Sequence, residues 1–244
     1  MTGALVIIPA RMAATRLPRK PLADICGKPM IVRVVEQALN ADIGPVVVAT
    51  DTQEIADAVE KAGCRAVLTR PDHPSGSDRI HEAVDLVDPD RTFDTVLNVQ
   101  GDVPLIEPDA IRAALSPLSI PEVAIGTIVT EFTSAAFRDD PNFVKAIATP
   151  NGQGQLRTLY FSRATAPYGD GVFYHHIGIY AYRRAALAKF VSLPPAPLEQ
   201  REKLEQLRAL EAGMRIDASV ISSAPMDVNT PDDLERARAA YQSL

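Results

Sequence analysis

The chain has 244 residues, of which 46% are hydrophobic and 23% charged, the composition of a globular protein able to bury a core. Its formal net charge of −6 gives no general attraction to nucleic acid or to an anionic membrane, so neither partner is expected. Cys26 and Cys64 lack metal-ligand spacing and are expected to be reduced thiols. We find no signal peptide and no apolar stretch of membrane-spanning length, which predicts a cytoplasmic protein.

The first half of the chain alternates apolar runs with amphipathic segments. Leu5–Ile8 is continuously apolar, as strands buried on both faces of a parallel sheet are. We predict strands over residues 5–8, 46–50, 66–68 and 95–99, and helices over 29–39, 53–62 and 78–87. This alternation predicts an α/β fold with a mostly parallel central sheet and flanking helices.

The second half is richer in β-branched and aromatic runs. We predict strands over residues 123–129, 144–149, 173–182 and 215–221, and helices over 184–190, 198–212 and 230–242. The last helix has Thr230 as its N-cap and Pro231 at its first position. We interpret residues 1–244 as one domain, with a core from about 1–118 and 216–244 and a smaller β-rich subdomain from about 119–215.

A basic loop follows the first predicted strand. Four cations lie within ten residues, at Arg11, Arg16, Arg19 and Lys20. A loop in this position presents backbone amides and cationic side chains to a polyphosphate. The alternative is a solvated basic loop, which Pro18 and the overall acidity of the protein disfavour. The G-x-x-x-x-G-K-[ST] and G-x-G-x-x-G patterns are both absent from this loop, which argues against a P-loop or a dinucleotide-binding dehydrogenase.

A carboxylate stands at the end of another predicted strand. Asp102 follows Gly101 directly after the strand at 95–99. Ligands bind outside the carboxyl ends of strands in such sheets, and Mg²⁺ prefers one or two carboxylates together with phosphates and water. The alternative is an Asp that caps a turn. With the basic loop after the first strand, a Mg²⁺–nucleotide site is the better interpretation.

Several motifs together resemble a known family. The stretch from Ile8 to Leu22, with Gly27-Lys28-Pro29-Met30, resembles the signature of sugar nucleotidyltransferases. More specific motifs resemble the 3-deoxy-manno-octulosonate (Kdo) cytidylyltransferases, also called CMP-Kdo synthetases, over almost the whole chain. They are Ser75-Gly76-Ser77-Asp78-Arg79, Asn98-Val99-Gln100-Gly101-Asp102, Tyr160-Phe161-Ser162-Arg163-Ala164, His176-Ile177-Gly178-Ile179-Tyr180 and Leu204-Glu205-Gln206-Leu207-Arg208.

The resemblance implies an activity and a set of site residues. It implies a Rossmann-like nucleotidyltransferase fold, the conversion of CTP and Kdo to CMP-Kdo and pyrophosphate for lipopolysaccharide synthesis, Mg²⁺ as cofactor, and a homodimer formed through the β-rich subdomain. Arg11, Lys20 and Asp102 would act in catalysis. The nucleotide site would comprise Pro9, Ala10, Arg11, Lys20, Ser75, Gly76 and Arg79. The sugar site would comprise Arg16, Gln100, Arg163, His176, Tyr180 and Glu205.

Other readings of these residues stay open. His176 and Tyr180 could be core side chains of a strand, and Glu205 could lie on a solvated helix face. The chain also departs from the family pattern. Val103 stands where the family has Glu, the segment between Pro167 and His175 is short, and Asn229 replaces the usual second metal-binding Asp.

The substitution at Asn229 bears on the predicted metal site. Asp227 lies two residues away, so in an extended segment the two side chains share a face, and together they would supply the second metal ligand. The competing functions are a cytidylyltransferase for 8-amino-Kdo or a nonulosonate, and a nucleotide-binding regulatory protein without turnover.

Overall fold

The chain forms two units, each with its own strands and helices. The structure is a computed structural model and describes residues 3–13 and 16–243. The first unit combines Met1–Arg112 with Pro225–Leu244, and the second comprises Ala113–Ala224. The chain therefore leaves the first unit once and returns to it for its last twenty residues.

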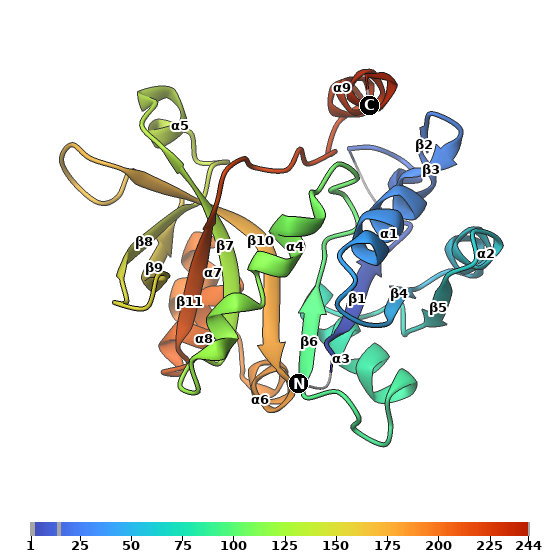
Figure 1. Cartoon of the computed structure of the whole chain (residues 1–244), viewed down its shortest axis with the longest axis horizontal. Coiled ribbons are helices and arrows are strands. Elements are labelled where there is room, and N and C mark those ends of the chain that lie inside the picture. The colour runs from blue at the N-terminus through green and yellow to red at the C-terminus, as the bar shows by residue number, and fades with distance from the viewer. Residues whose placement is uncertain (1–2, 14–15, 244) are drawn as a thin grey trace. The chain divides into compact units, whose positions relative to one another are not determined.

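Four parallel strands form the centre of the first unit. They are β1 (Leu5–Ala10), β4 (Val46–Thr50), β5 (Arg65–Leu68) and β6 (Thr95–Asn98), in the order β5-β4-β1-β6. Three helices flank them, namely α1 (Met30–Asn40), α2 (Gln53–Lys61) and α3 (Gly76–Val87) (Figure 1). Both β1 and β4 are almost wholly buried, which explains their continuous apolar runs. The predicted strands and helices of this unit are confirmed, and their ends agree with the prediction to within two residues.

The last segment of the chain packs onto the start of the first unit. A short 3₁₀ helix η1 (Lys20–Leu22) and a hairpin of β2 (Asp24–Ile25) and β3 (Lys28–Pro29) precede α1, and β2 shares one hydrophobic cluster with the final helix α9 (Pro231–Gln242). The buried members of the cluster are Leu17, Ile25, Met30, Val228, Leu234 and Ala237. This packing brings residues near position 229 close to the basic loop, although more than 200 residues separate them.

The second unit has mainly antiparallel strand pairs. Its strands are β7 (Ile125–Phe132), β8 (Lys145–Pro150), β9 (Leu156–Ser162), β10 (Phe173–Arg183) and β11 (Ile216–Ile221), in the order β10-β7-β11-β9-β8. Only the β11–β7 pair of this unit is recorded as parallel among its described residues. The helices are α5 (Ala135–Asp139), α6 (Arg184–Ser192), α7 (Pro197–Glu202) and α8 (Gln206–Glu211), with a short η2 (Ser116–Ser119), while α4 (Pro108–Ala113) precedes them at the unit boundary.

Three expectations for the second half need correction. Parallel strand pairs are largely restricted to the first unit. The strand predicted at 215–221, which we expected in the nucleotide-binding core, lies in the second unit as β11. Strand β9 is absent from our prediction, although Leu156 and Thr158 alternate with exposed residues as a half-buried strand requires.

The helix predicted at 198–212 is two helices, α7 and α8. Lys203 adopts a left-handed backbone conformation with φ 56° and ends α7. The break lets Glu199 of α7 form an ion pair of 2.5 Å with Arg208 of α8. In a continuous helix, residues nine apart point to opposite sides and could not pair.

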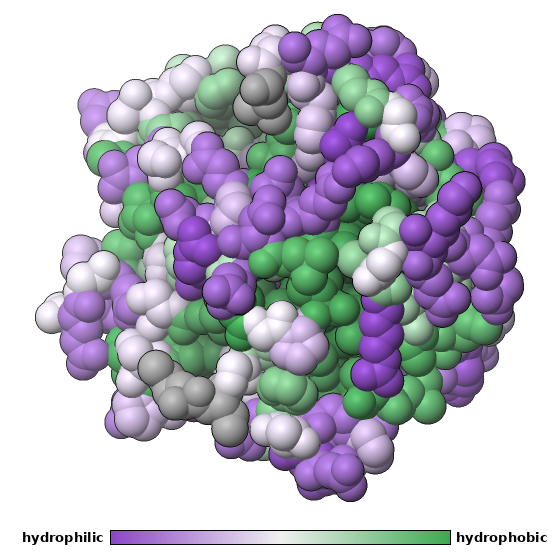
Figure 2. Space-filling model, turned by 45° about the vertical axis from the view of Figure 1, so that its right-hand side comes forward, coloured by the Kyte–Doolittle hydropathy of each residue, from purple (hydrophilic) through white to green (hydrophobic). Residues whose placement is uncertain are grey.

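No helix within residues 3–13 and 16–243 is long and apolar enough to cross a membrane. Hydrophilic residues cover much of the face shown in Figure 2, with hydrophobic areas between them.

Candidate active site

A cavity opens at the carboxyl ends of β1 and β6 in the first unit. Its volume is about 760 Å³, in the usual range for small-molecule sites. The two strand ends approach closely at Gly101, where a Cβ atom would lie 2.8 Å from the carbonyl oxygen of Pro9. Glycine is therefore required there for backbone packing. The lining includes Pro9, Ala10, Arg11, Arg16, Lys20, His73, Ser75, Gly76, Arg79, Gln100, Asp102 and Asn229.

The cavity is cationic although the protein is acidic. Four of its lining side chains are Arg or Lys, and Asp102 is its one carboxylate among the described residues. Arg11 and Arg16 are exposed and form no ion pair with any residue that the structure describes. Unpaired cations that converge on a concave surface attract an anion, and several together suit a polyphosphate.

Lys20 lies between two oxygen-bearing side chains. Its Nζ donates to Asp102 Oδ2 at 2.8 Å and to Asn229 Oδ1 at 2.9 Å. The backbone N–H of Val228 donates to the carbonyl oxygen of Asp102 at 2.9 Å, which fixes the C-terminal segment beside the turn after β6. The pair predicted to bind metal, Asp102 and Asn229, is thus brought together around a cation.

Asp227 lies close to the same cluster but does not line the cavity. Its side chain is accessible to solvent, yet the surrounding protein and then the negative charge of Asp102 raise its pKa to about 7. No group of three His, Cys, Asp or Glu residues with metal-binding geometry occurs in the described part of the chain. Asp102, Asp227 and the amide oxygen of Asn229 nevertheless suit Mg²⁺, which needs few protein oxygens when phosphates and water complete its shell.

The predicted loop at residues 75–79 is the N-cap and first turn of α3. Ser75 Oγ accepts a hydrogen bond from the Asp78 N–H at 3.3 Å and donates to Asp78 Oδ2 at 2.6 Å. Ser75 and Gly76 line the cavity, so the positive end of this twelve-residue helix faces it. A helix N-terminus favours bound anions through its free N–H groups and its dipole.

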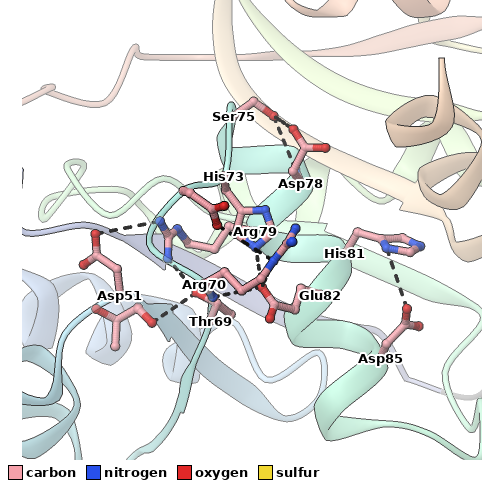
Figure 3. A network of polar contacts seen from close by, with 12 residues as sticks. Asp51, Thr69, Arg70, His73, Ser75, Asp78, Arg79, His81, Glu82 and Asp85 are labelled. Carbon is pink, nitrogen blue, oxygen red and sulfur yellow. Dashed lines mark hydrogen bonds and ion pairs between the residues drawn. The ribbon is translucent and has the colours of Figure 1, made fainter. Parts of the chain in front are cut away.

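Asp51 is a residue of this site that sequence reasoning missed. Its Oδ1 accepts a hydrogen bond from the Met12 N–H at 3.1 Å, and its Oδ2 lies 3.8 Å from the Arg79 guanidinium. Arg79 also donates to Thr69 Oγ1 at 2.5 Å (Figure 3). Burial lowers the pKa of Arg79, and the charge of Asp51 opposes that effect. Asp51 therefore ties the basic loop and a buried cavity arginine to the end of β4.

His73 and Glu82 form a second contact beside Arg79 (Figure 3). Glu82 also accepts a hydrogen bond from the Arg70 N–H at 3.1 Å. Burial acts to raise the pKa of Glu82, but the hydrogen bonds from His73 and Arg70 lower it overall, so the carboxylate stays ionised. In the sequence, the only signal that could have identified His73 and Glu82 as site residues is that they lie two and seven residues from Ser75.

In the second unit, His176, Tyr180 and Glu205 lie near one another. The rings of His176 and Tyr180 have centroids 5.4 Å apart. Burial, and then the charge of His175, lowers the pKa of His176 to about 3, so the imidazole is neutral. Burial also raises the pKa of Tyr180, with Tyr182 and Glu205 adding to the effect. Glu205 is half-buried at the start of α8 and lies 3.8 Å from Arg208. It therefore does not lie on a fully solvated face.

Arg163 has more partners than the sequence suggested. Its Nε donates to the carbonyl oxygen of Glu202 at 2.9 Å, and its Nη1 donates to that of Pro141 at 3.0 Å. The Arg163 N–H donates to the Glu202 carboxylate at 2.9 Å, so an acidic neighbour is present. The side chain links β9 to the end of α7, and its half-exposed guanidinium still has further N–H donors.

Comparison with known proteins assigns the family. Residues 5–216 match the family model described as "Cytidylyltransferase". The chain is 62% identical to the 3-deoxy-manno-octulosonate cytidylyltransferase of Azorhizobium caulinodans, covering 98% of this chain and 96% of that protein. It is 63% identical to the protein of the same name from Rhodopseudomonas palustris, covering 97% and 96% of the two chains.

The solved structures agree. A structure described as CMP:2-keto-3-deoxy-manno-octonic acid synthetase complexed with CTP is 39% identical and superposes with a TM-score of 0.91, covering 99% of this chain and 100% of that one. The likeness therefore extends over both units and confirms the nucleotidyltransferase-type α/β fold, with its central sheet and flanking helices. The chain belongs to the family of 3-deoxy-manno-octulosonate cytidylyltransferases.

Proposed function

We propose that this enzyme transfers the cytidylyl group of CTP to Kdo, giving CMP-Kdo and pyrophosphate for lipopolysaccharide synthesis. The observation that carries the proposal is the cationic cavity at the ends of β1 and β6, in a chain of this family. The sugar hydroxyl attacks the α-phosphorus, and the bond to the β-phosphate oxygen breaks as pyrophosphate leaves. Such a transfer depends on positioning and charge neutralisation more than on covalent chemistry.

The nucleotide is proposed to bind in the first unit. Arg11, Lys20 and Arg79 neutralise the triphosphate, and the first turn of α3 at Ser75 and Gly76 donates N–H groups to it. Pro9 and Ala10 of β1 also line the cavity. Asp51 holds Arg79, and Asp102 and Asn229 hold Lys20, before the substrate arrives. The charge that develops on the departing pyrophosphate therefore meets cations already in place.

A Mg²⁺ ion is proposed to be held by Asp102, with Asn229 and Asp227 nearby. When bound, it would polarise the phosphate oxygens and neutralise their charge. Lys20 holds Asp102 and Asn229 in position through its two hydrogen bonds. The positive charge of Lys20 also favours the ionised form of Asp227, and so opposes the effects of the surrounding protein and of the charge on Asp102.

Sugar recognition is proposed for two sets of residues, one in each unit. Arg16 and Gln100 line the cavity, and His176, Tyr180, Glu205 and Arg163 belong to the second unit. Guanidinium groups suit the sugar carboxylate, whereas Gln, Tyr and Glu suit hydroxyl groups. We also propose a homodimer through the second unit and a cytoplasmic location, where CTP is available. An 8-amino-Kdo or nonulosonate substrate is the alternative.

Pyrophosphate release tests the function directly. The enzyme is incubated with CTP, Mg²⁺ and each of Kdo, 8-amino-Kdo and a nonulosonate, and the initial rates are compared. Kdo should give the highest kcat/KM, and omission of either CTP or sugar should abolish release. A higher kcat/KM with another acidic sugar would change the substrate assignment. No release with any sugar would favour a regulatory nucleotide-binding protein.

A further inference from the structure

Strand β10 contains an irregularity between two residues of the proposed sugar site. His176 pairs with Val129 and Ile177 with Ile128, but Tyr180 pairs with Thr127, so Gly178 and Ile179 are inserted into the register. In a straight strand, residues four apart are separated by about 13 Å. The rings of His176 and Tyr180 are instead 5.4 Å apart. The bulge therefore brings two polar aromatic side chains together.

Thr127 of β7 lies at the centre of this bulge. Its Oγ1 is buried and lies 2.7 Å from the carbonyl oxygen of Ile179 and 3.2 Å from Nε2 of His176. The carbonyl oxygen of Ile177 lies further away, at 3.3 Å. A hydroxyl group carries one proton. The short contact between two oxygen atoms requires that proton, so Thr127 donates to Ile179.

This assignment fixes the proton on the imidazole. With its own proton directed at Ile179, Thr127 Oγ1 can only accept from His176, so Nε2 carries the imidazole proton. Nδ1 is then the nitrogen with a lone pair. Nδ1 forms no hydrogen bond with any residue that the structure describes. Burial keeps the ring neutral, so both the tautomer and the charge of His176 are defined.

We propose that Thr127 is a positioning residue that presents His176 Nδ1 as a hydrogen-bond acceptor beside the Tyr180 ring. The ligand group that fits Nδ1 is a donor, such as a hydroxyl of a polyhydroxylated sugar acid. Tyr180 is protonated and supplies the complementary donor. A substrate hydroxyl both donates and accepts, so the pair matches it in both directions. The identity of the substrate rests on the proposed function, whereas the tautomer does not.

The tautomer is measured on the full-length protein labelled with ¹⁵N-histidine. Long-range ¹H–¹⁵N correlation spectra distinguish a protonated ring nitrogen from one with a lone pair, and the four histidines can be assigned with single His→Gln variants. His176 should show a protonated Nε2 and an unprotonated Nδ1. Protonation at Nδ1 instead would overturn the proposal, whatever the enzyme's substrate.

Variants of Thr127 test its positioning role. Thr127→Val keeps the shape of the side chain but removes the oxygen that accepts from His176 Nε2, so His176 should no longer be held in a single tautomer. KM for Kdo should rise about tenfold, the effect of losing one hydrogen bond. KM for CTP should stay within about twofold. Thr127→Ser should restore both the spectrum and KM. Thr158→Val is the matched control, because the buried Thr158 hydroxyl has no partner among the described residues.

The outcomes are distinct. An unchanged His176 spectrum and unchanged KM for Kdo in Thr127→Val would overturn the positioning role. An equal rise of both KM values, or the same effect in Thr158→Val, would also overturn it, because that pattern indicates general loss of structure. If Thr127→Val does not fold, the spectrum and KM of Thr127→Ser and the tautomer of His176 in the wild-type protein still test the proposal. A correct tautomer without turnover of Kdo would refute the proposed substrate alone.

Discussion

Asp51 offers a sharp test of how the cavity is held in place. The substitution Asp51→Asn keeps an oxygen that can accept from the Met12 N–H but removes the charge opposite Arg79. The side chains of Asp51 and Arg79 are only 11% and 5% exposed. At their separation of 3.8 Å, two unit charges interact by about 4 kcal/mol at an effective dielectric constant of 20. Thr69 still binds Arg79, so we expect the free energy of unfolding to fall by about 3 kcal/mol.

Urea denaturation measures this loss. The chain has six Tyr and no Trp, so far-UV circular dichroism or tyrosine fluorescence follows unfolding. The midpoint should fall by roughly 1 M urea, given a typical dependence of unfolding free energy on urea for a protein of this size. Asp90→Asn, at an exposed acid of the same unit, is the control and should change the free energy by less than about 0.5 kcal/mol.

A double-mutant cycle isolates the ion pair. In an Arg79→Met background the buried cation is gone, so Asp51→Asn should cost less than about 1 kcal/mol. Asp51→Ala should be worse than Asp51→Asn in the wild-type background, because it also leaves the Met12 N–H without its acceptor. A cost below about 1 kcal/mol for Asp51→Asn, or equal costs in both backgrounds, would refute the reasoning.

Four further predictions concern the rest of the site. Asn229→Asp adds a carboxylate at the proposed Mg²⁺ site and should lower the Mg²⁺ concentration for half-maximal rate about tenfold; an unchanged Mg²⁺ titration would contradict the metal role. Asp102→Asn should reduce kcat on the order of hundredfold with an unchanged circular dichroism spectrum, and near-normal kcat would exclude it as a ligand. Arg163→Lys should raise KM for Kdo and leave KM for CTP unchanged, because Lys lacks the planar fork; altered CTP kinetics would move it to the nucleotide site. Burial acts to raise the pKa of Asp233, but hydrogen bonds, first from Arg236, lower it to about 2. The ionised Asp233 should therefore stabilise the folded protein by about 2 kcal/mol above about pH 4, and this contribution should be lost as the pH falls toward 2. The urea midpoints of wild type and Asp233→Asn should accordingly differ at pH 6 and converge at low pH.

The sequence alone determined the features that depend on neighbouring residues. Continuous apolar runs marked β1 and β4, and the capping pattern at Thr230 marked the start of α9. The cations of the basic loop and Asp102 were found because parallel strands present their carboxyl ends at one edge, so residues that follow each strand are brought together by the fold class itself. The loop residues 14–15 of that prediction lie outside the described residues.

Tertiary structure alone decided the contacts between residues far apart in the chain. Lys20 contacts Asn229 because a hydrophobic cluster returns the last segment to the start of the first unit, and no local pattern encodes a separation of 209 residues. The Asp51–Arg79 pair, the break at Lys203 and the bulge before Tyr180 arise in the same way. Each of these features either interrupts a regular helix or strand or buries a charge. Each is stabilised only by contacts with residues that folding brings close to it.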